Sequence, residues 1–364
     1  MSNKVHCKTQ NVYKLSHMYK PVMIILLICG YDLNIKNGFL YSFIAKFYCV
    51  SLVLVVIYSS LECCPKDLSQ LWSLFEYTAS VMVILLFRSR TEKFFKMLKD
   101  IDSYLRINKR RHIHSIYKII VLSIVTWSLR ISYTVMYCCI YACYDNLVLY
   151  VIRQFSLIGL DFNRVWRCIM FDAVRYRLKL LRIRLEEFPE CNYYLYVNNN
   201  KSIKENKLKF CLFVYRHIAD MVDVISPELH ASLFLSVAGS APKLITNVYH
   251  ILTAIEGREP VESLGYVIMH VVQISLLLFS PFLIVEHYSV EVEKMRLFLM
   301  HRLIDGNDPT LKEDIETFIQ YTHVRTFKFR IWRIIPINMS LPLELINMCV
   351  TYVIVVINFT HLYG

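Results

Sequence analysis

Five polar side chains recur along the last apolar segment of the chain at the spacing of one helical face. Ser340, Glu344, Asn347, Thr351 and Asn358 are separated by four, three, four and seven residues, and a helix repeats about every 3.6 residues, so all five share a face. Carboxylate, amide and hydroxyl groups hydrogen-bond water and coordinate hydrated cations. Lipid cannot satisfy them, so this face meets protein or water. The spacing alone does not distinguish a face buried against another helix from a face that lines water.

The composition places this segment in a membrane. Hydrophobic residues make up 56% of the 364 residues and charged residues 19%, with a mean hydropathy of +0.41, which is too apolar for a soluble domain of this length. A helix needs about 17–25 mostly apolar residues to cross the hydrocarbon. The segments that meet this length are Phe39–Leu61, Leu71–Phe87, Ile116–Tyr137, Leu147–Phe171, Leu229–Ile255, Leu264–Val285 and Met339–Thr360. Pro21–Cys29 is too short to span, which predicts an interfacial or re-entrant helix.

Basic residues orient the predicted bundle. Five Lys or Arg residues precede the first span, nine lie between 88 and 111, ten between 175 and 216, and eight between 294 and 333. The alternate loops hold only Lys66 and Arg258, and basic residues are retained on the cytoplasmic side. The sequence therefore predicts an all-α membrane protein with seven transmembrane helices, a cytoplasmic N-terminus and an extracellular C-terminus. The net charge of +12 reflects topology and contact with the lipid membrane, and nucleic acid is not an expected partner.

Long inner loops predict a helical layer on the cytoplasmic side. Charges at helical spacing in Arg175–Glu187 extend the fourth span inward. Phe210–Ile225 resumes an amphipathic helix, which Ser226-Pro227 separates from the fifth span, and Leu311–Ile335 forms another. The predicted divisions are a cytoplasmic N-terminus with a short interfacial helix (1–38), six transmembrane helices with a ligand-binding outer half (39–286), a cytoplasmic amphipathic helix of an anchor layer (287–338), and the last helix with its extracellular end (339–364).

Two smaller sets of residues carry local predictions. Asp161 and Arg164 lie one turn apart in the fourth span and are expected to pair with each other. Several of the twelve cysteines fall at predicted outer helix ends. There they could form a disulfide or remain free thiols packed between helices, and their spacing does not decide between the two. These are Cys63, Cys64, Cys138, Cys139 and Cys143.

The predicted outer halves of the second to sixth spans are rich in aromatic and polar side chains. Aromatic walls with a few convergent polar groups are what a small-molecule site inside a bundle requires. The candidate ligand-binding residues are Trp72, Tyr77, Tyr133, Tyr137, Arg153, Gln154, Asn247, His270 and Gln273. An arginine within a span needs a partner or water, so we expect Arg153 to face the cavity. Sparse carboxylates in this region argue against amine ligands, whereas sugars and alkaloids fit aromatic and amide chemistry.

The end of the last span resembles the C-terminal signature of the insect gustatory receptor family. That signature reads Thr-Tyr, five hydrophobic residues, then Gln-Phe. Thr351, Tyr352, the run 353–357 and Phe359 match it, while Asn358 stands in place of the Gln. Length, span number and orientation also agree with the family, so the resemblance covers the chain by topology and its end by motif.

The resemblance implies a ligand-gated cation channel built from four identical or mixed subunits, in which the last helix of each lines a central pore. The residues that would form the pore and its gate are Glu344, Asn347, Thr351, Val355, Asn358 and Phe359. It also implies a taste receptor in the plasma membrane of sensory neuron dendrites, opened by a small-molecule tastant and needing no cofactor. Glu344 would add a ring of carboxylates that favours cations, or would pair with Arg330 or Arg333.

Other classes of protein fit the sequence less well. A G-protein-coupled receptor has an extracellular N-terminus, opposite to the charge pattern, and its Asp-Arg-Tyr and Asn-Pro-x-x-Tyr motifs are missing here. Enzyme motifs, metal-ligand spacings and the glycine-interrupted helix pairs of transporters are missing too. An insect odorant receptor, a relative with the same architecture, is the nearer alternative, and the Thr-Tyr…Phe ending favours the gustatory branch.

Overall fold

The computed structural model describes residues 16–33, 39–63, 68–105, 109–141, 147–187, 200–255, 264–305, 309–325, 330–331, 335–336 and 338–363, together with 257 and 327. The helices are α1 (Ser16–Ile28), α2 (Phe39–Cys63), α3 (Leu68–Tyr104), α4 (Lys109–Tyr141), α5 (Leu147–Glu186), α6 (Asn200–Ile255), α7 (Leu264–Asp305), α8 (Pro309–Val324) and α9 (Ser340–Tyr363). Strands β1 (Arg330–Ile331) and β2 (Ile335–Pro336) pair antiparallel, with Arg330 opposite Pro336. The described chain is therefore helical apart from this short hairpin.

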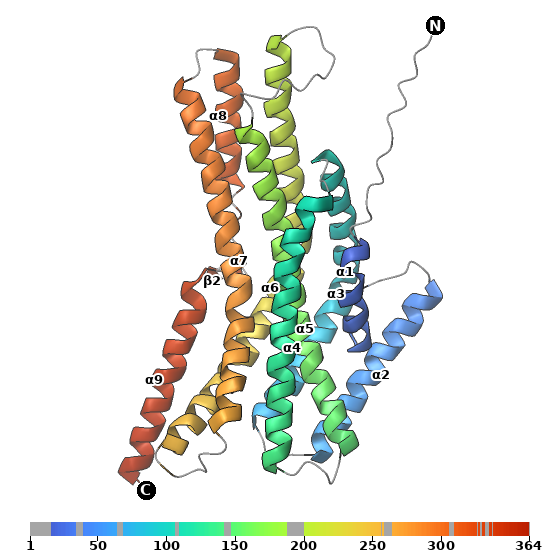
Figure 1. Ribbon diagram of the computed structural model, residues 1–364, viewed down its shortest axis with the longest axis vertical. Coiled ribbons are helices and arrows are strands. Elements are labelled where there is room, and N and C mark those ends of the chain that lie inside the picture. The colour runs from blue at the N-terminus through green and yellow to red at the C-terminus, as the bar shows by residue number, and fades with distance from the viewer. Residues whose placement is uncertain are drawn as a thin grey trace.

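Each predicted span corresponds to a separate helix, α2 to α7 and α9, and only the last span begins one residue before its helix (Figure 1). Helix α5 packs against α2, α3, α4 and α7, and α6 packs against α3, α7 and α9, so these two helices form the centre of the bundle. Among the described residues, α2, α3, α6 and α7 are long and apolar enough to cross a membrane. Shorter apolar segments, Ile120–Met136 and Ser340–Val356, lie in α4 and α9. The all-helical class is confirmed, while seven crossings remain a prediction.

Large apolar side chains cover the outside of the bundle. On α2, Phe43, Phe47 and Leu54 are 63%, 68% and 61% exposed. Exposing this much apolar surface to water is unfavourable. A helix that is apolar on all sides and exposed on one side is therefore expected to contact lipid. This surface supports the membrane class drawn from the composition.

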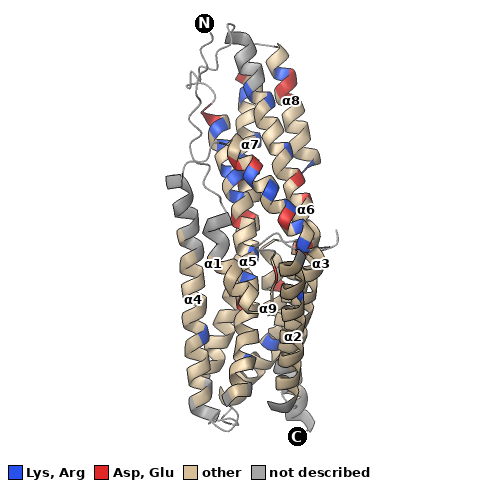
Figure 2. Cartoon of the chain, turned by 90° about the vertical axis from the view of Figure 1, so that its right-hand side faces the viewer, with Lys and Arg blue, Asp and Glu red and all other residues tan. Residues whose placement is uncertain are grey.

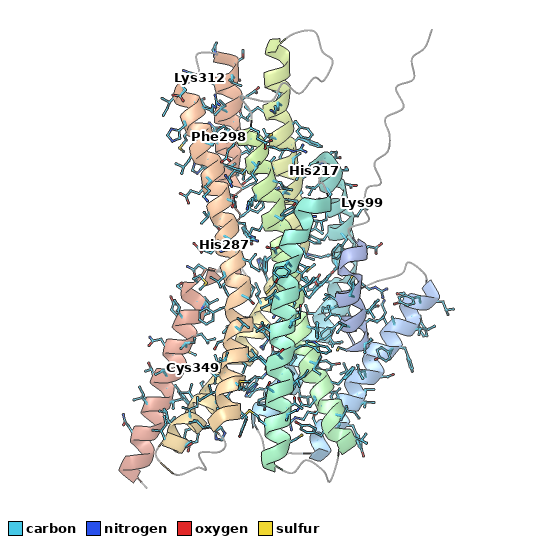
Figure 3. All side chains as sticks on the ribbon, in the orientation of Figure 1. Lys99, His217, His287, Phe298, Lys312 and Cys349 are labelled. Atoms are coloured by element: carbon cyan, nitrogen blue, oxygen red, sulfur yellow. The ribbon has the colours of Figure 1, made fainter. Side chains whose placement is uncertain are left out.

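The two ends of the molecule differ in charge. Figure 2 shows acidic and basic residues gathered at the end that holds α8, and few of them in the other half. Lys99, His217 and Lys312, labelled in Figure 3, lie toward this charged end. Ion pairs join the helices there: Arg177 binds Asp102 at 2.8 Å, and Arg182 binds Glu291 at 2.6 Å. The C-terminal end of α9 lies at the opposite end of the molecule (Figure 1).

The inner helices differ from prediction at two places. The extension of α5 through Arg175–Glu187 is confirmed as far as Glu186, but the predicted break at Ser226-Pro227 is wrong, because α6 continues through it. Burial on both sides of the proline holds the helix together. Ile225 and Leu229 are buried, and Thr91 donates to the Glu228 carboxylate at 2.5 Å.

The predicted helix Leu311–Ile335 is also wrong in its extent, because α8 ends at Val324 and the β1–β2 hairpin follows. Contacts with α6 redirect the chain at this point. Tyr215 donates to the Arg325 carbonyl at 3.1 Å, and the Tyr215 ring lies 5.3 Å from the ring of buried Phe327. The segment 287–338 is accordingly the end of α7, then α8, then the hairpin.

A short helix lies before the first span, as predicted: α1, which begins five residues earlier than expected and packs against α5, while its interfacial position remains a prediction. Leu26 is fully buried, whereas Ile24 and Ile28 are about half exposed, so one face enters the bundle. Gly30 follows with a φ of +89°, the left-handed conformation that ends helices and favours glycine. Tyr77 of α3 donates to the Cys29 carbonyl at 2.8 Å and fixes this end.

Candidate ligand cavity and pore face

A cavity of about 80 Å³ lies between α2, α3, α4, α5, α6 and α7. It lies near the ends of α2, α4 and α6 and the beginnings of α3, α5 and α7, in the half of the molecule away from α8 (Figure 1). Its lining consists of Ser60, Ser73, Leu74, Tyr133, Arg153, Ser156, Leu157, Thr246, Asn247, His250, Tyr266, Val267 and His270.

His270 connects the aromatic and amide parts of the cavity wall. Its ring stacks on Tyr133, with centroids 4.8 Å apart, and the Tyr133 ring lies 6.0 Å from that of Tyr266. Asn247 Nδ2 lies 3.2 Å from His270 Nδ1. Apolar ring faces with a few placed polar groups are what small-ligand recognition requires.

The structure brings four of the predicted ligand-binding residues together in this cavity: Tyr133, Arg153, Asn247 and His270. Two others join helices instead. Tyr77 holds the end of α1 through the Cys29 carbonyl, and Gln273 Nε2 donates to Asp161 at 2.6 Å. Both side chains are buried in the bundle outside the cavity lining.

Two more predicted residues, Gln154 and Trp72, also lie outside the cavity lining. Gln154 is buried and accepts a hydrogen bond from Thr134 at 3.2 Å. Trp72 is 36% exposed and packs edge-on against Phe75. The side chain of Tyr137 lies outside the described residues.

Several polar lining residues were not predicted: Ser60, Ser73, Ser156, Thr246, His250 and Tyr266. Helical spacing could have indicated some of them. Ser156 follows Arg153 by three residues, His250 follows Asn247 by three, and Tyr266 precedes His270 by four, so each pair shares a face. Ser60 and Ser73 lie on other helices and gave no such signal.

Next to the cavity lies a buried ion cluster, which we define as Glu76, Arg130, Asp161, Arg164 and Lys243. Glu76 binds Arg164 at 2.6 Å and Lys243 at 2.7 Å, joining α3, α5 and α6. Asp161 binds Arg130 at 2.7 Å, joining α5 to α4. Charges of this kind are expensive inside a membrane unless they are paired, so the cluster fixes how these helices pack.

The predicted pair between Asp161 and Arg164 is therefore wrong. Residues one turn apart on an exposed helix meet each other, but α5 is surrounded by other helices. Asp161 faces Arg130 of α4 and Gln273 of α7, whereas Arg164 faces Glu76 and Ser240. Partners on neighbouring helices replace the local partner.

Gly239 provides a test of how firmly the ion cluster is held. A Cβ at this position would lie 2.6 Å from Glu76 Oε2, and two ion pairs hold that carboxylate in place. We expect Gly239→Ala to destabilise the folded protein by about 1–3 kcal/mol through overpacking, measured as a lower melting temperature. Gly265→Ala is the matched control, since its Cβ would meet only the mobile end of Met136 at 2.9 Å. Equal melting temperatures for the two variants would contradict a rigid cluster.

The polar face of α9 points away from the rest of the chain. Pro342, Leu345, Cys349 and Val353 are buried, at spacings of three, four and four residues. This face packs on α6, where the Cys349 thiol lies 3.8 Å from the Ala241 carbonyl. Figure 3 labels Cys349 on α9. The buried face is opposite the polar one on the helix. Packing against another described segment of this chain therefore does not explain the polar residues.

The candidate pore residues lie on the outer face of α9. Those with described side chains are all exposed: Glu344, Asn347, Thr351, Val355 and Asn358. Ser340 and Tyr352 are exposed too, whereas the side chain of Phe359 lies outside the described residues. A row of exposed polar groups on an apolar helix requires either water or another protein surface.

Comparisons with known proteins agree with this architecture. A family model described as 7tm Chemosensory receptor matches residues 33–362. Among solved structures, the insect olfactory receptor OR5 from Machilis hrabei, in complex with eugenol, has a similar fold, with a TM-score of 0.67 at 11% sequence identity. The match covers 96% of this chain and 99% of that one. No curated protein matches the sequence. Because the family model spans most of its length, the chain belongs to the 7tm chemosensory receptor family.

Proposed function

We propose that this chain is a subunit of a gustatory receptor, a non-selective cation channel opened by a small-molecule tastant such as a bitter plant compound or a sugar. The observation that carries the proposal is the exposed polar face of α9, opposite the face that packs on α6. Four such helices around an axis would enclose a wet path lined by carboxylate, amide and hydroxyl groups. The gustatory ending Thr351-Tyr352…Phe359 supports the taste branch.

The proposed assembly is a homo- or heterotetramer in the plasma membrane of sensory neuron dendrites. The N-terminus would be cytoplasmic, and the charged end with α8 would form the anchor layer between subunits. The C-terminal end of α9 would then open outside the cell, beside the half of the bundle that holds the cavity.

An odorant receptor subunit is the second candidate function. The fold likeness to an olfactory receptor solved with eugenol favours it, and both candidates share the channel mechanism. Expression in oocytes with panels of tastants and volatile odorants would separate them by the class of compound that opens the current.

Recording membrane current in those oocytes also tests the channel itself. A ligand-evoked cation current that persists when G-protein signalling is blocked supports the proposal. A response that needs G-protein signalling, or an epitope tag that places the C-terminus inside the cell, would contradict it.

Asn358 yields a prediction about the closed gate. Its amide is one methylene shorter than that of Gln, so a ring of Asn358 side chains would leave a wider gap. We expect Asn358→Gln to lower the ligand-free current severalfold while ligand-evoked current is retained. The measurement is basal current per receptor at the cell surface, with Ser340→Ala, at the other end of α9, as the control. If Asn358→Gln leaves both the ligand-free current and the ion selectivity unchanged, Asn358 does not form part of the gate.

A further inference from the structure

We propose that the cavity between α2 and α7 accepts a small organic anion, a molecule that carries a carboxylate, with Arg153 as its counter-ion. This inference rests on the proposed function, because it names the class of ligand that the receptor would recognise. Three properties of the cavity support it: Arg153 has no acidic partner among the described residues, the described lining holds no acidic residue, and the neighbouring ion cluster carries an excess positive charge.

Arg153 is half-buried, whereas the basic residues of the ion cluster are buried, as is Arg167, which donates hydrogen bonds to Ser232. Within the described part of the chain, Arg130, Arg164 and Lys243 each bind a carboxylate, whereas no acidic side chain lies within ion-pair distance of Arg153. Arg153 lines the cavity. An arginine inside a membrane span needs a counter-charge or water, and its guanidinium is shaped to bind a carboxylate through two parallel hydrogen bonds.

The rest of the described wall offers hydrogen-bond donors. Its lining residues include serine, threonine, asparagine, tyrosine and histidine, and none of the described ones is an aspartate or a glutamate. Asn247 Nδ2 donates to His270 Nδ1 at 3.2 Å, which leaves the hydrogen of the His270 ring on Nε2 as a further donor. A protonated amine would find no acidic counter-charge among the described lining residues, whereas a carboxylate would find Arg153.

The ion cluster adds a positive field on the inner side of the cavity. It holds three basic residues, Arg130, Arg164 and Lys243, against two carboxylates, Glu76 and Asp161, which leaves one positive charge in excess. The Arg130 guanidinium lies 5.6 Å from the ring of Tyr133, a lining residue. The dielectric constant is lower inside the bundle than in bulk water, so this excess charge acts more strongly there and favours an anion.

The size of the cavity limits the ligand to a small molecule. The space is about 80 Å³, and one wall is formed by the Tyr133 ring, which stacks on His270 and lies tilted to the ring of Tyr266. A carboxylate on a single ring or a short chain fits this description. The probes for a test are acetate, lactate, benzoate and phenylacetate, each compared with its amide, together with benzylamine.

The test measures binding to the purified full-length receptor, by ligand-induced change in melting temperature at neutral pH. At least one acid should bind about 10–100-fold more tightly than its amide, since hydrogen bonds to charged groups contribute that much. Arg153→Gln should abolish this preference while amide binding is unchanged, and Arg153→Lys should restore part of it. Arg90→Gln is the matched control, because Arg90 is exposed and lies about 24 Å along α3 from Leu74.

Several results would overturn the inference. They are that no acid in the panel binds, that amides or benzylamine bind as tightly as the acids, or that Arg153→Gln keeps the preference. If Arg153→Gln misfolds, it will also lose amide binding. The test then rests on Arg153→Lys, which should retain part of the preference for acids over amides. Current recordings separate this inference from the proposed function. Acid binding that depends on Arg153, with no current opened by any compound in the panels, would contradict the channel and leave the anion site. A ligand-evoked current without any acid binding would contradict the anion site and leave the channel.

Discussion

Glu76→Ala is expected to prevent the receptor from folding into a stable bundle. The Glu76 carboxylate is 2% exposed and binds Arg164 and Lys243, each with 4% of its side chain exposed. Removing the shared acid leaves two buried cations without a partner, and breaking a buried ion pair in this way costs about 3–5 kcal/mol. The yield of monodisperse receptor after detergent extraction and its melting temperature should both fall sharply.

Two further variants separate the loss of charge from the loss of packing. Glu76→Gln keeps an oxygen that can accept hydrogen bonds, so it should be less defective than Glu76→Ala. The double variant Glu76→Ala with Lys243→Met should recover part of the stability, because one uncompensated cation is removed with little change in volume. Glu316→Ala, at an exposed position in α8, is the control for loss of a carboxylate. If Glu76→Ala melts at the same temperature as this control, the ion cluster does not stabilise the bundle.

The polar residues show what a sequence can predict about a helical membrane protein. Which residues share one face of a helix depends only on their spacing in the sequence. The polar face of α9, from Ser340 to Asn358, could therefore be predicted. Which helix meets which face depends on packing that spacing does not contain. The pairing of Arg164 with Glu76, across 88 residues of sequence, therefore escaped prediction.

The cavity and the helix ends illustrate the same limit. Arg153 was identified because a charge inside a span is unusual whatever surrounds it, and it lines the cavity. Ser60 and Ser73 are ordinary helix residues whose place in the lining follows only from how α2 and α3 meet the other helices. Pro227 read as a break because a proline weakens an isolated helix, yet contacts from neighbouring helices keep α6 continuous there.

Glu344→Lys is expected to remove most of the cation current while the receptor still reaches the cell surface. Glu344 is exposed on the face of α9 opposite the α6 contact, so the folded subunit should tolerate the change. In a four-subunit channel, the substitution exchanges four negative charges for four positive ones around a narrow path. Like charges within a few ångströms strongly disfavour permeating cations, and we expect conductance to fall by about tenfold or more.

Selectivity separates this explanation from a structural one. The reversal potential under a salt gradient should move toward that of anions in Glu344→Lys, and Glu344→Gln should give an intermediate value, because charge and not shape sets the change. If Glu344 instead pairs with Arg330 or Arg333, Glu344→Lys would lower surface expression without a shift in reversal potential. In that case Arg330→Ala and Arg333→Ala would reproduce the defect. A normal current with an unchanged reversal potential would mean that the polar face of α9 does not line the ion path.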